Sequence, residues 1–541
     1  MVTTDEVADV LSLTAKLMEV LEENPFKIKS LANAAFRLSK TNIDLSGLSL
    51  QELEKIEGIG KSIAGKIVEI RETETTRELQ VLLEKTPKGI VEMLSVKGIG
   101  PKKIGQLWRE LHVESIGELL YACHENRLVD LKGFGAKTQE SVMKAIEFKI
   151  SNNGKYHYAT IEANAAKLVE ALKQKYNTDK VSLVATLRRK CEIIESIEIL
   201  VGTENPIETT YSPGINIPLH IIYCKPGEYF YLLVKHSSTE KHLDLIGFNS
   251  LTQTDFESEE AVYRAMNLPY IEPELREGFL EVDLARANKL PVLIRFEDLK
   301  GSLHNHSKYS DGLNTLEEMA VHCKELGYEY LGICDHSQTA VYANGLKAER
   351  VIEQHKEIEK LNIQLAPFKI LKGIESDILN DGSLDYPEEV LKTFDFVVAS
   401  VHQNLKMDEE KATSRLIRAI ENPYTSILGH PTGRLLLARP GYPIQHKKVI
   451  DACAANGVII ELNAHPYRLD IDWRWIPYCL EKGVNISINP DAHEKQGYHD
   501  MYFGVCAARK GMLTKEMCLN TMSLSEIEDF LIKRKVKRAG H

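Results

Sequence analysis

The sequence predicts a multidomain protein with an all-α N-terminal region, an α+β middle region and a C-terminal α/β domain. Three observations lead to this prediction. A short phrase with two glycines recurs three times before residue 150. Shorter β-rich runs replace the helical pattern between about residues 155 and 295. From Leu303 onward strands and helices alternate, which predicts a parallel sheet or a barrel.

The bulk composition is typical of a soluble globular protein. The 541 residues are 43% hydrophobic and 27% charged, and they suffice for several domains of roughly 100–200 residues. No run of about 18 apolar residues predicts a membrane span, and Met1–Glu6 lacks the basic start of a signal peptide. The nine cysteines form no C-x-x-C pair, which indicates reduced thiols in the cytoplasm. A net charge of −11 argues against a generally basic coat for nucleic acid, but not against local phosphate contacts.

Each glycine phrase predicts two helices joined by a tight turn. The glycines and the lysines that follow them are Gly58, Gly60, Gly98, Gly100, Lys102, Gly133, Gly135 and Lys137. Glycine permits the turn, and Ile59, Ile99 and Phe134 between the glycines would hold the two helices together. Backbone N–H groups at the start of the second helix would form an anion site. We therefore expect contacts to the phosphate backbone of DNA, which do not read sequence; a plain helix–helix turn is the alternative.

These repeats resemble helix-hairpin-helix motifs, and their order resembles the N-terminal part of family X DNA polymerases. The resemblance implies a lyase-like domain at residues 1–80 and a fingers-like domain at 81–153. In that family a lysine in the helix after the first hairpin acts in deoxyribose-phosphate lyase chemistry through a Schiff base. Lys66 occupies the matching position and is therefore a candidate catalytic residue. A solvated lysine on a helix face is the alternative.

The middle region resembles the palm of the same family at 154–226 and its thumb at 227–298, without the palm's catalytic carboxylates. The family pattern places Asp-x-Asp on one strand and a third Asp on its neighbour. Here Ser196 and Glu198 occupy the first two positions, and the third falls near Pro218. Because Mg²⁺ depends on acidic oxygen ligands, we expect a palm that folds but does not polymerise. An active gap-filling polymerase is the alternative.

Histidines and acidic residues recur at strand ends in the C-terminal region. In the H-x-H step, His304 and His306 point to the same side of an extended strand and can reach one metal ion. Later strands also end in His, Asp or Glu, at the edge where βα folds carry chemistry. The nine candidate ligands are His304, His306, Asp311, His336, Glu375, His402, His430, Asp491 and His493. Nine exceed the roughly four ligands of Zn²⁺ or six of Mn²⁺, and they suit a cluster of three ions.

The residues around these ligands resemble the motifs of a PHP (polymerase and histidinol phosphatase) domain, here at 299–541. The motifs are Leu303–Gly312, Cys334–His336, Gly373–Glu375, Ser400–His402, Gly429–Arg434 and Asp491–His493. With residues 1–295, almost the whole chain resembles bacterial family X DNA polymerases that carry a C-terminal PHP domain. The resemblance implies a distorted βα barrel and three divalent ions, Mn²⁺ and/or Zn²⁺, with Fe²⁺ as a further alternative. Ser302 departs from it, since Asp usually precedes the Leu-His step.

The resemblance also divides the ligands among the ions. The first ion would take His304, His306, Glu375 and Asp491; the second would share Glu375 and add His402 and His430; the third would take Asp311, His336 and His493. Arg434, shortly after His430, is a candidate catalytic residue that would clamp a phosphate oxygen. A structural salt bridge is its alternative role.

Together these features predict a metal-dependent phosphoesterase that processes DNA. A 3′–5′ exonuclease acting on gapped, nicked or single-stranded 3′ ends is the favoured activity, and cleavage at abasic sites or 3′-end trimming is left open. A phosphatase of the histidinol-phosphate type and a non-catalytic DNA-binding scaffold compete with this prediction. We expect a cytoplasmic protein without a membrane partner, with a monomer favoured.

Overall fold

The computed structural model describes residues 2–539 except 40–42, 44, 46, 97, 130, 152–153 and 207–216. The chain divides into two compact units, Met1–Lys149 and Ile150–His541. The predicted limits of the five smaller domains stay predictions. Among the described residues, no helix is long and apolar enough to cross a membrane.

The first unit consists of α-helices and their connections. The helices are α1 (Thr4–Val20), α2 (Pro25–Leu38), α3 (Leu50–Leu53), α4 (Lys61–Thr73), α5 (Arg77–Lys85), α6 (Lys88–Met93), α7 (Pro101–Leu111), α8 (Ile116–His124) and α9 (Ala136–Ser151). Side chains at the helix starts supply the missing hydrogen bonds, as at Thr3, which forms a capping box with Glu6. Leu11, Leu31 and Ile67 belong to one core that joins α1, α2 and α4.

The second unit begins with a small sheet that corresponds to the predicted palm. The strands β2 (Val181–Leu183), β4 (Ile197–Gly202) and β5 (Leu219–Cys224) lie in the order β2-β4-β5, with β2 antiparallel and β5 parallel to β4. A separate pair joins β1 (Tyr156–His157) to β3 (Ile193–Ile194), and α11 spans Ala185–Arg188. Helix α10 (Tyr158–Tyr176) shares a core with this sheet, in which Ile161 packs with Ile197 and Ile199.

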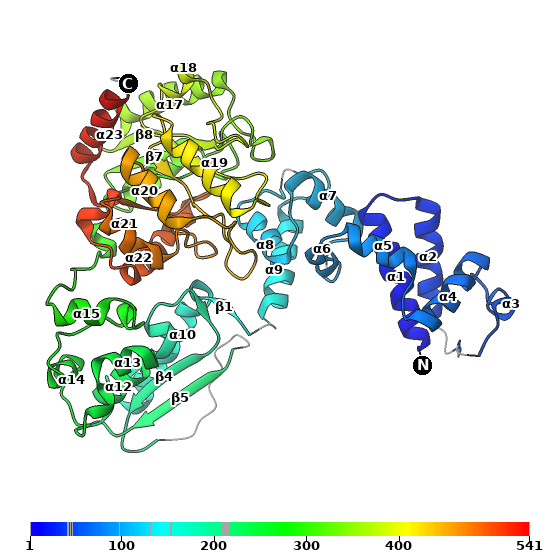
Figure 1. The fold of residues 1–541 in the computed structure, drawn as a ribbon, viewed down its shortest axis with the longest axis horizontal. Helices are drawn as coiled ribbons and strands as arrows, with labels where there is room; N and C mark the ends of the chain where they lie inside the picture. Colours follow the sequence, from blue (N-terminus) through cyan, green and yellow to red (C-terminus); the bar gives the residue numbers. More distant parts are fainter. Residues whose placement is uncertain are drawn as a thin grey trace. The chain divides into compact units, whose positions relative to one another are not determined.

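A group of helices with its own apolar core follows the sheet, in the region predicted as the thumb (Figure 1). These helices are α12 (Tyr229–His236), α13 (Glu240–Ile246), α14 (Glu259–Ala265) and α15 (Glu281–Arg286). Short 3₁₀ turns in this region are η1 (Phe248–Ser250), η2 (Pro273–Leu275) and η3 (Phe296–Asp298). Val262, Tyr263 and Ile271 are fully buried in this core.

The C-terminal part of the second unit is a βα barrel with parallel strands. The strands are β6 (Gly301–Ser302), β7 (Tyr330–Ile333), β8 (Lys369–Lys372), β9 (Glu375–Asp377), β10 (Val398–Ser400), β11 (Ile427–Leu428), β12 (Ile459–Asn463) and β13 (Ile486–Asn489). The helices are α16 (Leu316–Glu325), α17 (Ala348–Leu365), α18 (Glu388–Leu391), α19 (Glu409–Glu421), α20 (His446–Asn456), α21 (Ile476–Glu481), α22 (Met501–Lys510) and α23 (Leu524–Ala539). The 3₁₀ turns are η4 (Val341–Ala343), η5 (Trp473–Trp475), η6 (Lys495–Asp500), η7 (Lys515–Met517) and η8 (Leu519–Thr521).

Two parallel sheets join to close this barrel. Their orders are β6-β7-β8 and β13-β12-β11-β10-β9. Strand β8 leads through Gly373 and Ile374 directly into β9, which connects the sheets on one side. On the other side Asn305 pairs with Ala492, and the backbone N–H of His306 donates to the carbonyl of Ala492 at 2.9 Å. The expected distorted barrel is therefore confirmed.

The barrel is filled by side chains at the end opposite the ligands. Alternate residues of neighbouring strands, among them Tyr330, Leu371 and Val398, form a buried cluster with Ile527 and Leu531 of α23. Strand residues alternate between two faces, so a strand that sends one residue into this cluster directs its neighbours toward the surrounding helices. The filled end leaves the C-terminal edges of the strands as the place for a site.

Buried polar contacts connect the barrel to the palm and thumb within the second unit. Lys510 of α22 is 2% exposed, and its ammonium donates to Glu277 at 2.6 Å and to the carbonyl of Arg189 at 2.9 Å. Lys190 donates in turn to the hydroxyl of Tyr502 at 2.8 Å. Such contacts join the three parts into one packed body.

Candidate functional site

All nine predicted ligands lie at the C-terminal edge of the barrel. His304 and His306 follow β6, His336 follows β7, and Glu375 stands where β8 leads into β9. His402 follows β10, His430 follows β11, and Asp491 and His493 follow β13. Because parallel strands end at the same edge, residues from distant parts of the chain meet here. Asp311 reaches the same place from the loop after β6, where it contacts His306 and His336.

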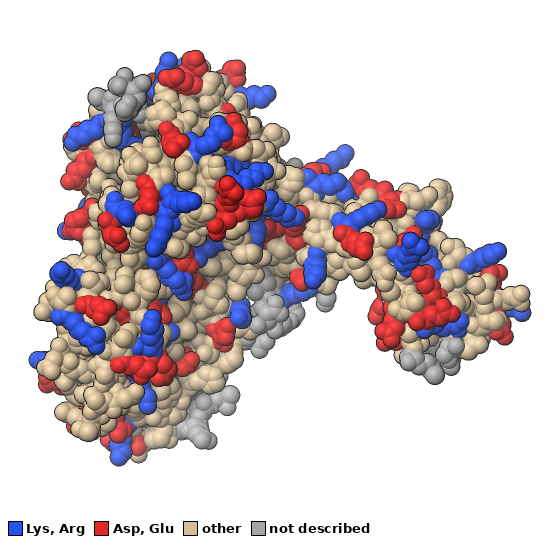
Figure 2. Space-filling view, in the orientation of Figure 1, with Lys and Arg blue, Asp and Glu red and all other residues tan. Residues whose placement is uncertain are grey.

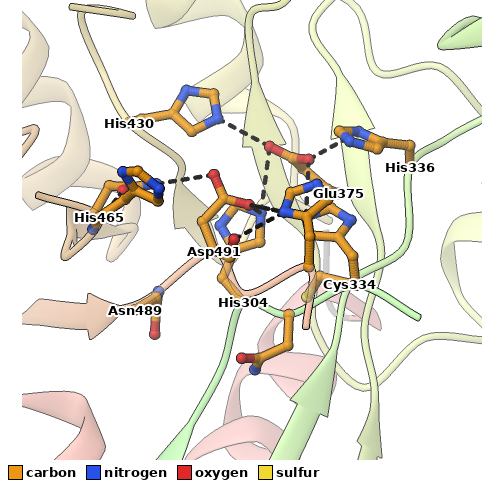
Figure 3. A network of polar contacts seen from close by, with 12 residues as sticks. His304, Cys334, His336, Glu375, His430, His465, Asn489 and Asp491 are labelled. Atoms are coloured by element: carbon orange, nitrogen blue, oxygen red, sulfur yellow. Dashed lines mark hydrogen bonds and ion pairs between the residues drawn. The ribbon is translucent and has the colours of Figure 1, made fainter. Parts of the chain in front are cut away.

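Glu375 is the centre of the cluster (Figure 3). One of its oxygens, Oε1, lies 3.0 Å from Nε2 of His430, 3.1 Å from Nε2 of His402 and 3.4 Å from Nε2 of His304. The other, Oε2, lies 2.9 Å from Nδ1 of His336. The carboxylate is 1% exposed. A buried carboxylate that contacts these four imidazoles, and Nε2 of His306 at 3.7 Å, has the arrangement expected of a bridging ligand.

Asp491 and Asp311 extend the cluster on the side of His306. Oδ1 of Asp491 lies 3.0 Å from Nε2 of His306 and 3.5 Å from Nε2 of His304. Asp311 approaches Nε2 of His336 at 3.5 Å and Nε2 of His493 at 3.4 Å. His306 lies between the two carboxylates, since its Nδ1 is 3.9 Å from Asp311. The nine side chains thus form one continuous cluster.

The donor set suits divalent metal ions. Three groups have ligand atoms within 4.8 Å of one another: His306, Asp311, His336 and His493; His304, His306 and Asp491; and His336, Glu375 and His402. Among the described residues, Nε2 of His304, Nδ1 of His306 and both ring nitrogens of His336 are buried without a hydrogen bond. Buried polar atoms are normally bonded, so unbonded nitrogens facing carboxylates fit an ion as the missing partner. Imidazole with carboxylate is a ligand set for Zn²⁺, Mn²⁺ and Fe²⁺.

These groups agree only in part with the division that the resemblance implied. His304, His306 and Asp491 fall together as expected, and so do Asp311, His336 and His493. Glu375 groups with His336 and His402, while His430 contacts Glu375 without joining a group. Which ion each side chain would hold therefore stays a proposal.

Opposite charges in this buried cluster shift the pKa values of its members. Burial alone would raise the pKa of Glu375, but the surrounding histidines, His402 first, hold that pKa well below its ordinary value. Burial would lower the pKa of His402, yet Glu375 and Asp377 raise that pKa to about 9. Without an ion His402 therefore favours its protonated form, and a metal ion must displace that proton to bind its imidazole.

Strand β12 contributes residues that the sequence reasoning missed. The carboxylate of Glu461, fully buried, accepts a hydrogen bond from Nδ1 of His304 at 2.7 Å and one from the backbone N–H of His430 at 2.7 Å. Asn463 donates to Asp491 at 3.0 Å. A signal for Glu461 was present, since a charged residue inside the apolar run Ile459–Asn463 needs a buried partner.

Two further carboxylates support ligands from outside the cluster. Asp377 accepts a hydrogen bond from Nδ1 of His402 at 2.5 Å. Asp335 accepts bonds from the backbone and side chain of Ser307 and from Ser310, and so holds the loop that carries Asp311. Asp335 was noted only as the neighbour of His336, because sequence alone does not distinguish a ligand from a residue that holds a loop.

His465 also belongs to the polar network drawn in Figure 3, although the sequence analysis assigned it no role. It follows β12, and its Nδ1 accepts a hydrogen bond from the backbone N–H of Tyr467 at 3.2 Å. That bond leaves the ring proton on Nε2 when the imidazole is neutral.

Arg434 lies in a structural ion pair rather than in an open phosphate site. Its Nη1 donates to Asp472 at 2.6 Å, its Nε donates to the carbonyl of Arg468 at 2.9 Å, and its Nη2 donates to the carbonyl of Leu469. The side chain is 15% exposed. The structure thus favours the salt bridge over the predicted clamp, because a clamp would have to give up these bonds.

Lys66 lies on α4 and pairs with Glu78 of α5. Burial would raise the pKa of Glu78, but the hydrogen bond from Lys66 leads a set of interactions that lower it. Lys27 lies 3.6 Å from the same carboxylate. To form a Schiff base, the amine of Lys66 would have to leave this contact with Glu78. The lyase role of Lys66 therefore stays a prediction without support from this geometry.

The three hairpins have the backbone geometry that their glycines predicted. Gly58, Gly98 and Gly133 have φ of +86°, +93° and +86°, in the left-handed region that favours glycine. Gly60 and Gly100 are the N-caps of α4 and α7, and neither provides a side-chain cap for the helix N–H groups. The three second glycines (Gly60, Gly100 and Gly135) border open space, since a Cβ placed there would meet nothing within 4 Å.

Apolar packing and exposed lysines complete these hairpins. Ile59 and Ile99 are buried as expected, whereas Phe134 is only half-buried and lies 4.7 Å from the ammonium of Lys103. Lys102 and Lys137 are exposed in the first turns of α7 and α9 and make no ion pair within the described part of the chain. In Figure 2 acidic and basic side chains alternate over the visible surface, so phosphate binding would depend on such local sites.

The residues that the resemblance matches to palm carboxylates lie together in the small sheet. Glu198 lies in β4 opposite His220 of β5, and it accepts a hydrogen bond from the hydroxyl of Ser196 at 3.0 Å. Pro218 lies beside this pair, since its carbonyl accepts a bond from the N–H of Ile197 at 2.8 Å. Arg188 nearby pairs with Glu259. The resemblance expects an acidic residue at each of these three positions. They lie next to one another in the structure, and of the three residues Glu198 is acidic.

Comparison with protein families supports three parts of this description. A helix-hairpin-helix domain model matches residues 3–76, and a SAM-like helix-hairpin-helix tandem matches residues 90–147. A PHP domain model matches residues 302–465. The last match covers the first seven predicted ligands.

Comparison with individual proteins gives a relative that aligns along nearly the whole chain. The DNA polymerase/3′-5′ exonuclease PolX of Bacillus subtilis is 32% identical over 566 residues, which cover 97% of this chain and 99% of that protein. A probable phosphatase of Acetivibrio thermocellus is 29% identical over 246 residues, 43% of this chain and 95% of that one. A solved histidinol phosphate phosphatase of Lactococcus lactis covers 39% of this chain at 16% identity, with a TM-score of 0.32 that supports no further argument.

Proposed function

Since the chain belongs to the family X DNA polymerases that carry a C-terminal PHP domain, we propose that it is a metal-dependent phosphodiesterase acting on DNA as a 3′–5′ exonuclease. The observation that supports this most directly is the cluster of nine imidazole and carboxylate side chains at one edge of the barrel. Cutting at abasic sites and trimming 3′ ends are activities of the same chemical type.

The side chains of the cluster would hold up to three divalent ions, Mn²⁺ and/or Zn²⁺. The nitrogens that lack hydrogen bonds, on His304, His306 and His336, are the natural donors, with Glu375 between them. Bound ions would supply the positive charge that stabilises phosphate oxygens and would make water acidic enough to act as a nucleophile near neutral pH. The residues of the chain itself contribute a buried set of ligands that already face one another.

The hairpins would hold the DNA backbone while the barrel acts on its end. Helix N-termini with unsatisfied N–H groups and nearby lysines bind phosphate without reading bases. Gly60 and Gly100 provide such helix starts, and Lys102 and Lys137 add charge. This division of labour explains how an acidic protein with a charge of −11 can act on DNA.

The palm would take no part in chemistry. Two ions at a nucleotidyl-transfer site require several acidic oxygens, and of Ser196, Glu198 and Pro218 one is acidic. We therefore propose that the palm retains its fold and its contacts with the barrel but does not polymerise.

A labelled-DNA assay tests the proposal. The full chain is incubated with Mn²⁺ and 5′-labelled single-stranded or gapped DNA, with and without dNTPs, beside a variant with His304→Ala and His306→Ala. Shortening from the 3′ end that the variant lacks is expected. Extension with dNTPs would contradict the silent palm, and absence of shortening under all conditions would contradict the exonuclease.

A phosphatase for small molecules is a second candidate. It is favoured by the probable phosphatases among the relatives, one of which, from Thermoanaerobacter sp., is 31% identical over 194 residues, or 33% of this chain. Rapid release of phosphate from histidinol phosphate, combined with no cleavage of DNA, would favour it. Three hairpins would then have no evident purpose.

A further inference from the structure

The structure assigns to Glu461 the role of positioning residue for the metal centre: it fixes His304 with Nε2 toward the cluster. This inference rests on the metal centre proposed above and deepens it. Glu461 belongs to β12, which supplies none of the nine predicted ligands. It is nevertheless fully buried directly beside them.

Each oxygen of the Glu461 carboxylate is engaged. Oε1 accepts from Nδ1 of His304 at 2.7 Å and from the amide of Asn489 at 3.0 Å. Oε2 accepts from the backbone N–H of His430 at 2.7 Å. These three hydrogen bonds stabilise a buried carboxylate that meets no arginine or lysine at ion-pair distance within the described residues. The arrangement links ligands that follow two different strands, β6 and β11.

The bond to Nδ1 decides which nitrogen of His304 can bind an ion. A neutral imidazole carries its proton on one nitrogen. Because Glu461 is an acceptor, the proton stays on Nδ1 and the lone pair lies on Nε2, which faces Glu375 at 3.4 Å and Asp491 at 3.5 Å. Carboxylates in this position fix the orientation of metal-binding histidines and increase their basicity.

His402 repeats this arrangement at the same oxygen of Glu375. Its Nδ1 donates to Asp377 at 2.5 Å, and its Nε2 faces Glu375 at 3.1 Å. His306 and His336 differ in that the carboxylates beside them are themselves predicted ligands: Nε2 of His306 bonds to Asp491 at 3.0 Å, and Nδ1 of His336 lies 2.9 Å from Glu375. The cluster therefore contains two histidines held through Nδ1 by carboxylates outside the nine ligands, and two whose carboxylate contacts lie within the cluster.

This difference implies unequal metal positions. The groups that contain His304 and His402 would bind an ion tightly, because their rings are held in place before binding. The group of Asp311, His306, His336 and His493 has one ring held through Nδ1, that of His493, by the carbonyl of Asp491 at 2.9 Å. Because that partner is a neutral carbonyl and not a carboxylate, this group would be the position that exchanges its ion most readily.

Metal binding, measured apart from catalysis, tests the inference. The chain is stripped with a chelator and reloaded with Zn²⁺ or Mn²⁺; the ions per chain are then counted by mass spectrometry, and their affinity is measured by competition with a chromogenic chelator. For Glu461→Gln we expect the tightest binding to weaken by about 10–100-fold. Asp377→Asn, which alters His402 instead, provides a second variant should Glu461→Gln fail to fold.

Glu281→Gln is a matched control. Glu281 is fully buried in the thumb-like region and accepts from Nδ1 of His242 at 2.6 Å, so the same change is made at a buried His–Glu pair outside the cluster. It is expected to leave the ion count unchanged. If Glu461 acts through His304, then Glu461→Gln adds little to the loss caused by His304→Ala.

The outcomes separate this inference from the proposed function. A wild-type chain that binds no ion overturns both. If the wild-type chain loads ions and Glu461→Gln and Asp377→Asn bind them equally well, the inference is overturned and the metal centre stands. Equal losses in Glu461→Gln and Glu281→Gln would show a general loss of stability and would also overturn it.

Discussion

The barrel edge and the palm sheet differ in what surrounds their acidic residues. At the barrel edge Glu375 lies among five imidazoles, and supporting carboxylates hold two of those rings from outside. In the palm Glu198 has Ser196 as its hydrogen-bond partner and lies opposite His220. Both regions are well packed, and apolar burial and backbone pairing stabilise each fold independently of the polar residues it carries.

The sharpest test of this difference is one substitution made in each region. Glu375→Gln is expected to lower the exonuclease rate by about 10³-fold or more, because it removes charge that would neutralise bound ions. Glu198→Gln should leave the rate within about twofold of wild type, since we assign the palm no chemistry. Initial rates on 5′-labelled DNA with Mn²⁺ give both values. A large loss of exonuclease rate in Glu198→Gln would contradict the proposal that the palm takes no part in the chemistry.

Substituting one arginine in each region tests whether its guanidinium group stabilises the fold. Arg434 pairs with Asp472 in the barrel and Arg188 with Glu259 beside the palm, all partly or largely buried. Replacing either arginine by Met should lower the free energy of unfolding by about 2–3 kcal/mol, as partners lose charged hydrogen bonds. Urea unfolding measures the loss. If Arg434→Met lost exonuclease activity with stability intact, the phosphate clamp would be restored as its role.

Lys102 and Lys137, which follow the second and third hairpins, test whether the first unit contacts DNA phosphates. In a double variant with Lys102→Ala and Lys137→Ala, the plot of log affinity for double-stranded DNA against log salt concentration should become shallower, its slope decreasing in magnitude by about 2. The reason is that each phosphate contact releases about one counterion. Fluorescence anisotropy at several salt concentrations gives this slope. Lys144→Ala on the same helix α9 is the control, since Lys144 pairs with Glu140 at 2.6 Å. An unchanged slope would remove the hairpins from the DNA-binding surface.

The smallest expected effect is on stability and involves Asp500, a carboxylic acid of the barrel outside the cluster of nine ligands. Burial, and then the charge of Glu494, raises the pKa of Asp500 to about 8. A carboxyl group whose pKa is higher in the folded than in the unfolded protein stabilises the fold at pH values below the unfolded-state pKa. This contribution is lost as pH rises through the folded-state pKa. Asp500→Asn should therefore raise the melting temperature by a few degrees at pH 8 and leave it unchanged near pH 4. A shift of equal size at both pH values would contradict this explanation.

Much of the site was predictable because its signals are local. A ligand at a strand end leaves a short apolar run followed by His, Asp or Glu, and parallel strands bring such ends together. The hairpin turns were predictable for a similar reason, since Gly58, Gly98 and Gly133 must have a left-handed backbone whatever surrounds them. The family resemblance of the whole chain followed from the same motifs and is confirmed.

The sequence by itself determined the order of domains, the barrel type and the nine side chains that meet at its edge. The tertiary structure alone decided that Glu461 supports His304, that Arg434 bonds with Asp472, and that Glu375 shares a group with His336 and His402. These contacts join residues far apart in the chain, and they depend on ring orientation and on the closure of the barrel between β6 and β13. A one-dimensional pattern shows which residues reach the edge, whereas the packed barrel determines which of them touch.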